Sequence, residues 1–289
     1  MNFLRILFLP ITAPIKFIQE HFKTVFFLTI VFYIFSSSET TNIQKANLHK
    51  IDLVGPIMMV DDVLEKIQKA KNDPAVKGVM INVNSPGGAV APSVELAYAI
   101  KELKEVKPVV VYASGVMASG SYYASIWANK IIANPGSMVG SIGVIMQGAN
   151  VSELMQKIGI KTQTVKVGEY KETGTPTRAW SDLEKAELDK VIKDTYDIFI
   201  SDVSSARGLK KEDHKIYANA HIFTARQAKE VGLVDEVATL SKAKADLINL
   251  SKVAKPIWNK EDKFEKFMDK LVSQTISKID MHFNGLKAY

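Results

Sequence analysis

The stretch KGVMINVNSPGGAVAPSVELAYAIKELKEVKPVVVYASGVMASGSYYASIWA, residues 77–128, decides the fold. Residues 79–84 and 108–113 are short runs rich in β-branched residues, which is typical of buried strands. Residues 94–106 lie between them and residues 119–128 follow, and both have the composition and length of helices. Strand, helix, strand and helix in succession predict an α/β fold with parallel strand connections.

The composition of the whole chain indicates a globular protein. The 289 residues are 47% hydrophobic and 24% charged, with ordinary Gly and Pro usage, so a disordered or collagen-like chain is excluded. The chain has no Cys, which excludes thiol nucleophiles, thiolate metal sites and disulfides. The net charge of +6 is small for this length, and no basic run has interleaved aromatics, so no nucleic-acid partner is expected.

An uncharged segment near the N-terminus predicts a membrane anchor. Residues 24–35 read TVFFLTIVFYIF, and the uncharged run continues to residue 38. This length covers roughly 22 Å of a hydrocarbon core of about 30 Å, so Lys23 would snorkel and the bilayer would thin locally. We predict one transmembrane helix over residues 24–38. The alternative is a cleaved signal peptide, but no small-x-small cleavage site follows the run.

Charges around the predicted anchor give its orientation. Arg5, Lys16 and Lys23 outnumber Glu20 before the span. The positive-inside rule then leaves residues 1–23 in the cytoplasm and the remainder of the chain in the periplasm or outside. The predicted location is the cytoplasmic (inner) membrane, crossed once.

The exported part reads as one domain over residues 42–240 and a helical extension over residues 241–289. Ser181 and Glu184 have the spacing of a capping box, which predicts a helix that ends before Gly208. Its apolar stripe is either core or a subunit contact. The extension is Lys-rich and amphipathic, so it could contact a neighbouring subunit or an anionic membrane surface, or be a solvated helix.

A glycine-rich turn follows the first of the two predicted strands. Residues 84–88 read NSPGG and lie where ligands of open α/β sheets gather. Because Gly87 and Gly88 lack Cβ, their backbone could turn an N–H group toward an oxyanion. Taken alone, the motif could equally be a turn with no other role.

Ser119 follows the second predicted strand and opens the next helix. Its small neighbours Ala118 and Gly120 leave room for a tetrahedral intermediate, and the helix N-terminus offers unpaired N–H groups. These features make Ser119 a candidate nucleophile. The alternative is that its side chain only caps the helix.

A nucleophilic serine needs a base, and Lys171 is the remaining candidate. The exported histidines, His49, His214, His221 and His282, lack the sequence context of a catalytic triad. Lys171 lies in GEYKETGTPTR, residues 168–178, between an aromatic residue and a turn. It could be a solvated lysine, but together with Ser119 it indicates the Ser-Lys class of hydrolases.

Five motifs in order resemble the signal peptide peptidase A family of membrane-anchored serine proteases. The resemblance covers about residues 50–237. The motifs are residues 84–88, Ser119-Gly120 with Tyr122-Tyr123, residues 140–144, residues 168–178, and residues 224–228 with 232–235.

This resemblance implies a ClpP/crotonase-like fold of repeated β-β-α units and assigns roles to five residues. Ser119 would be the nucleophile, Lys171 the general base, Gly88 and Gly120 the oxyanion hole, and Ser141 the residue that orients the lysine. In the short members of the family, the serine and lysine of one site come from neighbouring subunits of a homo-oligomeric ring. Ser121 departs from the family's usual glycine and could narrow the pocket or act as a rival nucleophile.

The expected function is therefore a membrane-anchored serine endopeptidase that degrades cleaved signal peptides or other apolar peptides at the membrane. Its partners would be the membrane, peptide substrates and other copies of the chain. Neither a metal nor an organic cofactor is expected, because no cluster of His, Asp and Glu has ligand spacing and no phosphate loop occurs. The alternatives are a crotonase-type acyl-CoA hydratase or isomerase and a non-catalytic ring-forming membrane scaffold.

Overall fold

The structure is a computed structural model that describes residues 19–36 and 45–260. It divides into two units, residues 1–45 and residues 46–289. The first unit contains one described helix, α3 (Phe22–Ser36), which overlaps the predicted anchor. Within the described residues, no helix has the length and apolar character that crossing a membrane requires. The final residues of the predicted anchor, 37 and 38, lie outside the described residues.

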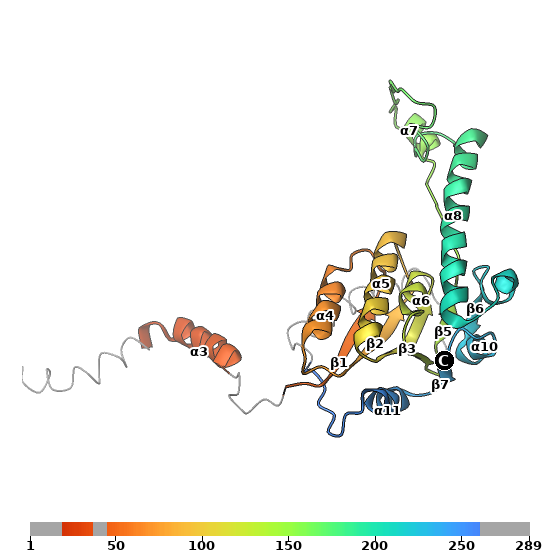
Figure 1. Cartoon of the computed structure of the whole chain (residues 1–289). Helices are drawn as coiled ribbons and strands as arrows, with labels where there is room; N and C mark the ends of the chain where they lie inside the picture. Colours follow the sequence, from red (N-terminus) through yellow and green to blue (C-terminus); the bar gives the residue numbers. More distant parts are fainter. Residues whose placement is uncertain (1–18, 37–44, 261–289) are drawn as a thin grey trace, which may run out of the picture. The chain divides into compact units, whose positions relative to one another are not determined.

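The second unit is an α/β domain built on a mixed seven-stranded sheet (Figure 1). Five strands follow one another in the order β1-β2-β3-β4-β7, and all of these pairs are parallel. The strand β5 pairs parallel with β3 and antiparallel with β6. The strands are β1 (Leu48–Val54), β2 (Gly78–Ser85), β3 (Val109–Ala118), β4 (Lys130–Ala133), β5 (Met138–Gly140), β6 (Ile222–Thr224) and β7 (Glu236–Val237). The α/β class and the parallel connections predicted from the sequence are confirmed.

The α-helices of this unit are α4 (Asp61–Asn72), α5 (Val90–Val106), α6 (Gly120–Ser125), α7 (Ser152–Lys157), α8 (Asp182–Arg207), α9 (His214–Tyr217), α10 (Ala225–Glu230) and α11 (Leu240–Ser251). Helices and strands alternate from β1 to α6, and three α-helices then lie between β5 and β6. A short 3₁₀ helix (Lys211–Asp213) precedes α9. The predicted helix at residues 94–106 is confirmed and begins four residues earlier, whereas the one predicted at 119–128 is shorter, because α6 ends at Ser125.

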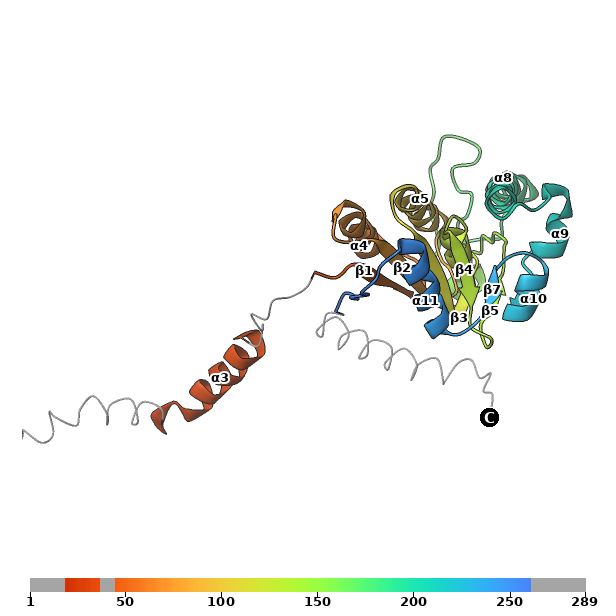
Figure 2. The ribbon, with the colours of Figure 1, turned by 60° about the horizontal axis from the view of Figure 1, so that its bottom comes forward.

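Alternate residues along the central strands face two separate hydrophobic cores. Val79 and Ile81 of β2 contact the larger core under α4, α5 and α6, whereas Met80 points to the opposite face. There it packs in a smaller core with Ala243 and Leu247 of α11. This arrangement follows from the two-residue period of a strand, and Figure 2 shows α11 on the face of the sheet opposite α4 and α5.

The packing of α11 changes the predicted domain boundary. The sequence predicted a helical appendage from residue 241 onward, but Ala243 and Leu247 are fully buried against the sheet. Ile257 also bonds to Asn47, just before β1, because the Asn47 N–H donates to the Ile257 carbonyl at 2.8 Å. The described residues 241–260 therefore belong to the packed domain. The rest of the predicted extension, residues 261–289, lies outside the described residues.

The long helix α8 has two halves in different environments. It begins with the predicted capping box between Ser181 and Glu184 and ends at Gly208, which has a left-handed backbone with φ of 66°. Phe199, Ile200 and Val203 in its second half are buried in the main core. The first half projects away from the sheet (Figure 1) and leaves apolar side chains exposed. The predicted apolar stripe is thus core in one half only.

Candidate active site

Ser119 lies in a strained turn between β3 and α6. Its backbone has φ of 53° and ψ of −124°, a conformation that a residue with a Cβ adopts rarely. The Ser119 N–H donates to the Gly140 carbonyl of β5 at 2.8 Å, which fixes the turn at the end of the sheet. The half-buried Ser119 side chain makes no capping hydrogen bond. The capping interpretation is therefore wrong, and the hydroxyl remains available for other chemistry.

Two glycine backbones meet beside Ser119. A Cβ on Gly88 would lie 2.2 Å from the Ile57 carbonyl oxygen, and a Cβ on Gly120 would lie 2.1 Å from Ser93 Oγ and 3.4 Å from the Gly88 nitrogen. Only residues without side chains allow this approach. Gly120 is the first residue of α6, so its N–H has no acceptor within the helix. Neither N–H has a hydrogen-bond acceptor within residues 45–260.

Ser119, Gly88 and Gly120 border one cavity of about 350 Å³. Apart from these three residues its lining is mostly apolar and aromatic. It consists of Val90, Ser93, Val94, Tyr98, Tyr123, Gly143, Val144, Thr195, Ile198 and Phe199. A hydroxyl and two free amide donors at the edge of an apolar cavity form a geometry suited to acyl transfer from an apolar substrate.

Asn84 connects β2 to the part of β3 that precedes Ser119. Its side-chain oxygen accepts from the Val116 N–H at 3.0 Å, where the pairing of β2 with β3 shifts register between Val83 and Ser85. This shift divides β3 into a first part that pairs with β4 and a second part that pairs with β5. The second part ends at Ala118, so the next residue, Ser119, lies at the edge of the cavity.

Ser121 is part of the protein core. It is 0% exposed, and its Oγ donates to the Ser85 carbonyl at 2.7 Å and accepts from the Ala118 N–H at 2.9 Å. It does not line the cavity. The Ser121 hydroxyl, where the family usually has glycine, therefore holds the end of β2 against the end of β3. Because Ser121 is buried outside the cavity, it is excluded as a rival nucleophile and as a residue that narrows the pocket.

Tyr123 connects the serine helix to α8. Its ring packs edge-on against Phe199 at 4.7 Å between centroids, and its hydroxyl donates to the Asp202 carboxylate in a short hydrogen bond. Burial and the Asp202 carboxylate raise the pKa of Tyr123 well above its ordinary value. Tyr123 is therefore a neutral donor at physiological pH, and it fixes the cavity wall that α8 provides.

Ser141 follows Gly140, the residue whose carbonyl is bonded to the nucleophile's backbone. The Ser141 N–H donates to the His221 carbonyl at 2.7 Å. Its φ of 50° again places a serine in the left-handed region. Ser141 does not line the cavity, although Gly143 and Val144 just beyond it do. Its predicted role in orienting a lysine stays a prediction.

Lys171 lies outside the cavity of its own chain. It is exposed in a turn over residues 168–174, which we call the lysine turn, where its N–H donates to the Gly168 carbonyl at 3.3 Å. The next residue, Glu172, shares Arg178 with Glu184 in the first turn of α8. From Glu184 to Phe199 at the cavity, α8 rises by about 22 Å. Lys171 is thus exposed and is not among the residues that line the cavity beside Ser119.

The histidines among the described residues of the second unit lie outside the lining of the cavity. His49, His214 and His221 do not line the cavity, and His282 lies outside the described residues. Burial lowers the pKa of His49, which favours its neutral form. Among residues 19–36 and 45–260, no group of three or more His, Asp or Glu side chains is arranged to hold a metal ion.

Sequence reasoning missed the contributions of distant segments to the cavity. Thr195, Ile198 and Phe199 come from α8, and Ser93, Val94 and Tyr98 come from α5. Ser93 is buried, and its hydroxyl donates to the Ala89 carbonyl at 2.8 Å. The sequence predicted an apolar stripe that includes Phe199, but no local signal shows that α5 and α8 meet the serine turn.

Comparison with known proteins supports the chemistry of this site. A family model described as "Peptidase family S49" matches residues 101–254, which include Ser119 and Lys171. A protein of Methanocaldococcus jannaschii named "Putative protease" is 43% identical over 195 residues, which are 68% of this chain and 62% of that protein. One of Enterococcus faecium named "Putative signal peptide peptidase SppA" is 35% identical over 175 residues, 60% of this chain and 51% of that protein.

The matched region therefore spans about half to three fifths of the length of these two curated relatives. Among solved structures, a ClpP1 mutant of Listeria monocytogenes is 16% identical with a TM-score of 0.45, and the match covers 67% of this chain and 93% of that chain. The ClpP/crotonase type of the fold stays a prediction beyond the α/β class and mixed sheet described above.

Proposed function

The chain belongs to peptidase family S49, and from this premise we propose that it is a serine endopeptidase with Ser119 as its nucleophile. The observation that carries the proposal is the position of Ser119 at the edge of an apolar cavity, beside the free N–H groups of Gly88 and Gly120. A hydroxyl nucleophile with two amide donors matches the requirements for attack on a peptide carbonyl.

The proposed reaction proceeds in two acyl-transfer steps. A neutral Lys171 amine accepts the proton of Ser119 Oγ while that oxygen bonds to the peptide carbonyl carbon, and the N–H groups of Gly88 and Gly120 stabilise the oxyanion. The C–N bond then breaks, and the lysine returns the proton to the leaving amine. Water attacks the acyl-enzyme in the same way, releases the carboxylic acid and restores the serine.

We propose that the lysine comes from a second copy of the chain. The exposure of Lys171 and its absence from the lining of the cavity in its own chain support this. A partner copy would also cover the apolar side chains on the first half of α8 and on the segment before it, such as Ile145, Val165, Val167 and Val191. Large exposed apolar surfaces of this kind mark interaction sites.

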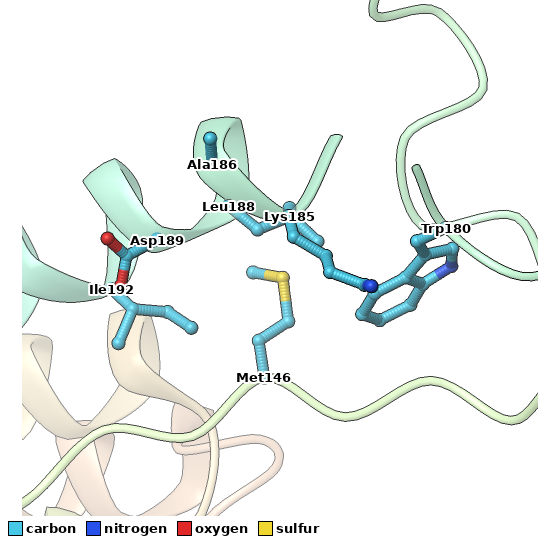
Figure 3. A pocket seen from close by; sticks show the side chains of 7 residues that line it. All are labelled: Met146, Trp180, Lys185, Ala186, Leu188, Asp189 and Ile192. Carbon is cyan, nitrogen blue, oxygen red and sulfur yellow. The ribbon is translucent and has the colours of Figure 1, made fainter. Parts of the chain in front are cut away.

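A groove on this projecting region is suited to such a contact. It has a volume of about 460 Å³ between residue 146 and the first half of α8, and Figure 3 shows Met146 pointing between Leu188 and Ile192, with Trp180 at one end. Its apolar residues are accompanied by Lys185 and Asp189 at the edge. We propose that this groove and the exposed side chains around it lie in the subunit interface.

The cavity favours apolar side chains in the substrate. Among the residues that the structure describes, no charged side chain lines it, so a charged residue of the substrate would lose its hydration without gaining a partner. We propose that the substrates are apolar peptides that lie at or leave a membrane, including remnants of signal peptides. We further propose that residues 24–38 anchor the chain in the cytoplasmic membrane, with the catalytic domain on its outer side.

The cleavage of peptides by the full-length protein tests this function. Purified protein in detergent is mixed with fluorogenic apolar peptides, and a fluorophosphonate probe with mass spectrometry identifies the acylated residue. We expect cleavage and labelling at Ser119, both lost in Ser119→Ala. Cleavage that persists in Ser119→Ala would refute the proposal, and a protein that assembles but leaves every peptide intact would favour the scaffold alternative.

The proposed membrane anchoring is tested separately by fractionation of cells that express the full chain. We expect the protein in the membrane pellet after carbonate extraction, and exogenous protease should digest the catalytic domain only once the outer side is accessible. Recovery in the soluble fraction would contradict anchoring without affecting the assignment of Ser119.

A further inference from the structure

We propose that Arg178 is a positioning residue that holds the lysine turn on the start of α8 and keeps the Glu172 carboxylate away from the Lys171 amine. This inference rests on the proposed function, because it concerns the geometry of the general base. It adds a residue for which neither the motif order nor the comparisons provide a role.

Arg178 binds Glu184 with both of its terminal nitrogens. Nη1 donates to Glu184 Oε2 at 2.8 Å and Nη2 donates to Glu184 Oε1 at 2.7 Å, which is the two-pronged pairing that a guanidinium makes with a carboxylate. The Glu184 side chain is only 4% exposed and also accepts from the Ser181 N–H at 2.8 Å in the capping box. Arg178 is thus bound to a carboxylate that the helix itself fixes.

The same guanidinium reaches the lysine turn. Nη2 also donates to Glu172 Oε2 at 3.2 Å, and that oxygen accepts from Lys166 Nζ at 2.7 Å. Glu172 is the immediate neighbour of Lys171. Its carboxylate therefore has two cationic partners other than Lys171 and is held in place by both. A carboxylate paired with the lysine would stabilise the ammonium form and remove the base.

The charged groups around this turn come from three segments. Lys166 precedes the turn, Arg178 follows it and Glu184 belongs to α8. Lys190, six residues further along α8, is paired with Glu187 and lies near Tyr170. The cationic partners lower the pKa of Glu172 below its ordinary value and hold that of Glu184 at about 2, so both carboxylates stay charged at physiological pH.

A second residue of the segment after the turn, Trp180, is held by contacts with Thr175 and Gly148. Trp180 Nε1 donates to the Thr175 carbonyl at 2.8 Å, and the Trp180 ring lies so close to Gly148 that a Cβ there would be 2.3 Å from the ring. Figure 3 shows Trp180 beside Lys185 of α8. Arg178 and Trp180 thus hold the segment in place by contacts on both sides of residue 179. The bonds of Arg178 to Glu172 and Glu184 therefore connect the lysine turn to the first turn of α8.

The test compares Arg178→Ala, Arg178→Lys and the double variant Arg178→Ala with Glu172→Gln in the full-length protein. We expect Arg178→Ala to lower kcat/KM by about 10- to 100-fold, because a displacement of about 1 Å has such effects. We also expect the acid limb of its pH–rate profile to move to higher pH, because Glu172 is released beside Lys171. The double variant should return the limb toward its wild-type position, and Arg178→Lys should restore the rate only in part, since an ammonium lacks the fork geometry.

Hydrogen exchange provides a readout that does not depend on peptidase activity. In Arg178→Ala, amide protection over residues 168–178 should fall while protection in β2 stays unchanged. Lys69→Ala, which removes an exposed ion pair with Glu65 on α4, is the matched control and should leave rate, profile and protection unchanged.

The outcomes separate the two proposals. An unmoved acid limb or full protection of residues 168–178 in Arg178→Ala overturns the role of Arg178. Cleavage that survives in Ser119→Ala, or a wild-type protein that cleaves nothing, refutes the proposed function and with it the catalytic part of this inference. In that case the exchange experiment alone decides whether Arg178 holds the turn.

Discussion

Replacing Gly88 by alanine tests the role of the Gly88 N–H in the oxyanion hole. The new Cβ would lie 2.2 Å from the Ile57 carbonyl oxygen, whereas Cβ atoms in proteins essentially never come closer than 3.0 Å to such a neighbour. The two backbones must therefore separate by at least about 0.8 Å. Ile57 is bonded on both sides of Gly88, to the Gly87 carbonyl at 2.9 Å and the Ala89 N–H at 2.8 Å, so the peptide group of residue 88 has to move.

The expected consequence is a loss of transition-state stabilisation. Removal of one oxyanion donor typically lowers kcat by about 10²- to 10³-fold, and a displacement of about 1 Å has an effect of about 10²-fold. We therefore expect Gly88→Ala to reduce kcat by about 10²-fold and to change KM by only a few-fold, because the apolar lining that binds the substrate remains.

The assay is steady-state cleavage of an apolar fluorogenic peptide, with thermal unfolding measured on the same samples. Gly136→Ala is the matched control, since a Cβ there would meet only Asn134 Oδ1 at 3.5 Å, an ordinary contact. This control should behave as the wild type. A folded Gly88→Ala protein with wild-type kcat would show that residue 88 does not serve the oxyanion.

Three further predictions concern other parts of the same structure. Ser121→Ala should lower the free energy of unfolding by about 1–3 kcal/mol, because it leaves buried backbone groups of Ser85 and Ala118 unpaired, yet the fluorophosphonate probe should still label Ser119; loss of labelling would contradict this. Tyr123→Phe should cost about 1–3 kcal/mol in a urea titration through the lost bond to Asp202, and an unchanged midpoint would show that this bond contributes nothing. Because the folded state holds the pKa of Glu184 at about 2, below the ordinary 4.5, its stabilisation is complete above pH 4.5 and is lost as the pH falls toward 2; Glu184→Gln should flatten unfolding stability across this interval, and an equally steep curve would refute it.

The elements with strong local signals could be predicted from the sequence. The Val-rich runs predicted β2 and β3, and Ser181, Glu184 and Gly208 marked both ends of α8. These signals depend on burial of a short strand and on local capping, which neighbouring residues determine. Ser119, Gly88 and Gly120, which the motifs had singled out, line one cavity, as expected for turns at the same ends of parallel strands.

Features that depend on distant packing could not be predicted. Whether Ser121 faces the cavity or the core depends on where the Ser85 carbonyl lies, 36 residues earlier in the chain. Ser119 has a positive φ and its N–H is bonded to the Gly140 carbonyl, and no residue preference predicts this conformation. Similarly, the Lys-rich composition from residue 241 onward predicted an appendage and did not indicate that α11 covers the sheet.

The most direct test of shared active sites is the mixing of two inactive variants. Ser119→Ala and Lys171→Ala proteins with different tags are each assembled, mixed at equal amounts under conditions that exchange subunits, and assayed after purification through both tags. If each site takes its serine from one chain and its lysine from another, about one quarter of the sites in a random mixture are complete, and peptide cleavage should return to roughly that fraction of the wild-type rate. Mixed oligomers that carry both tags and remain inactive would contradict a site built from two chains.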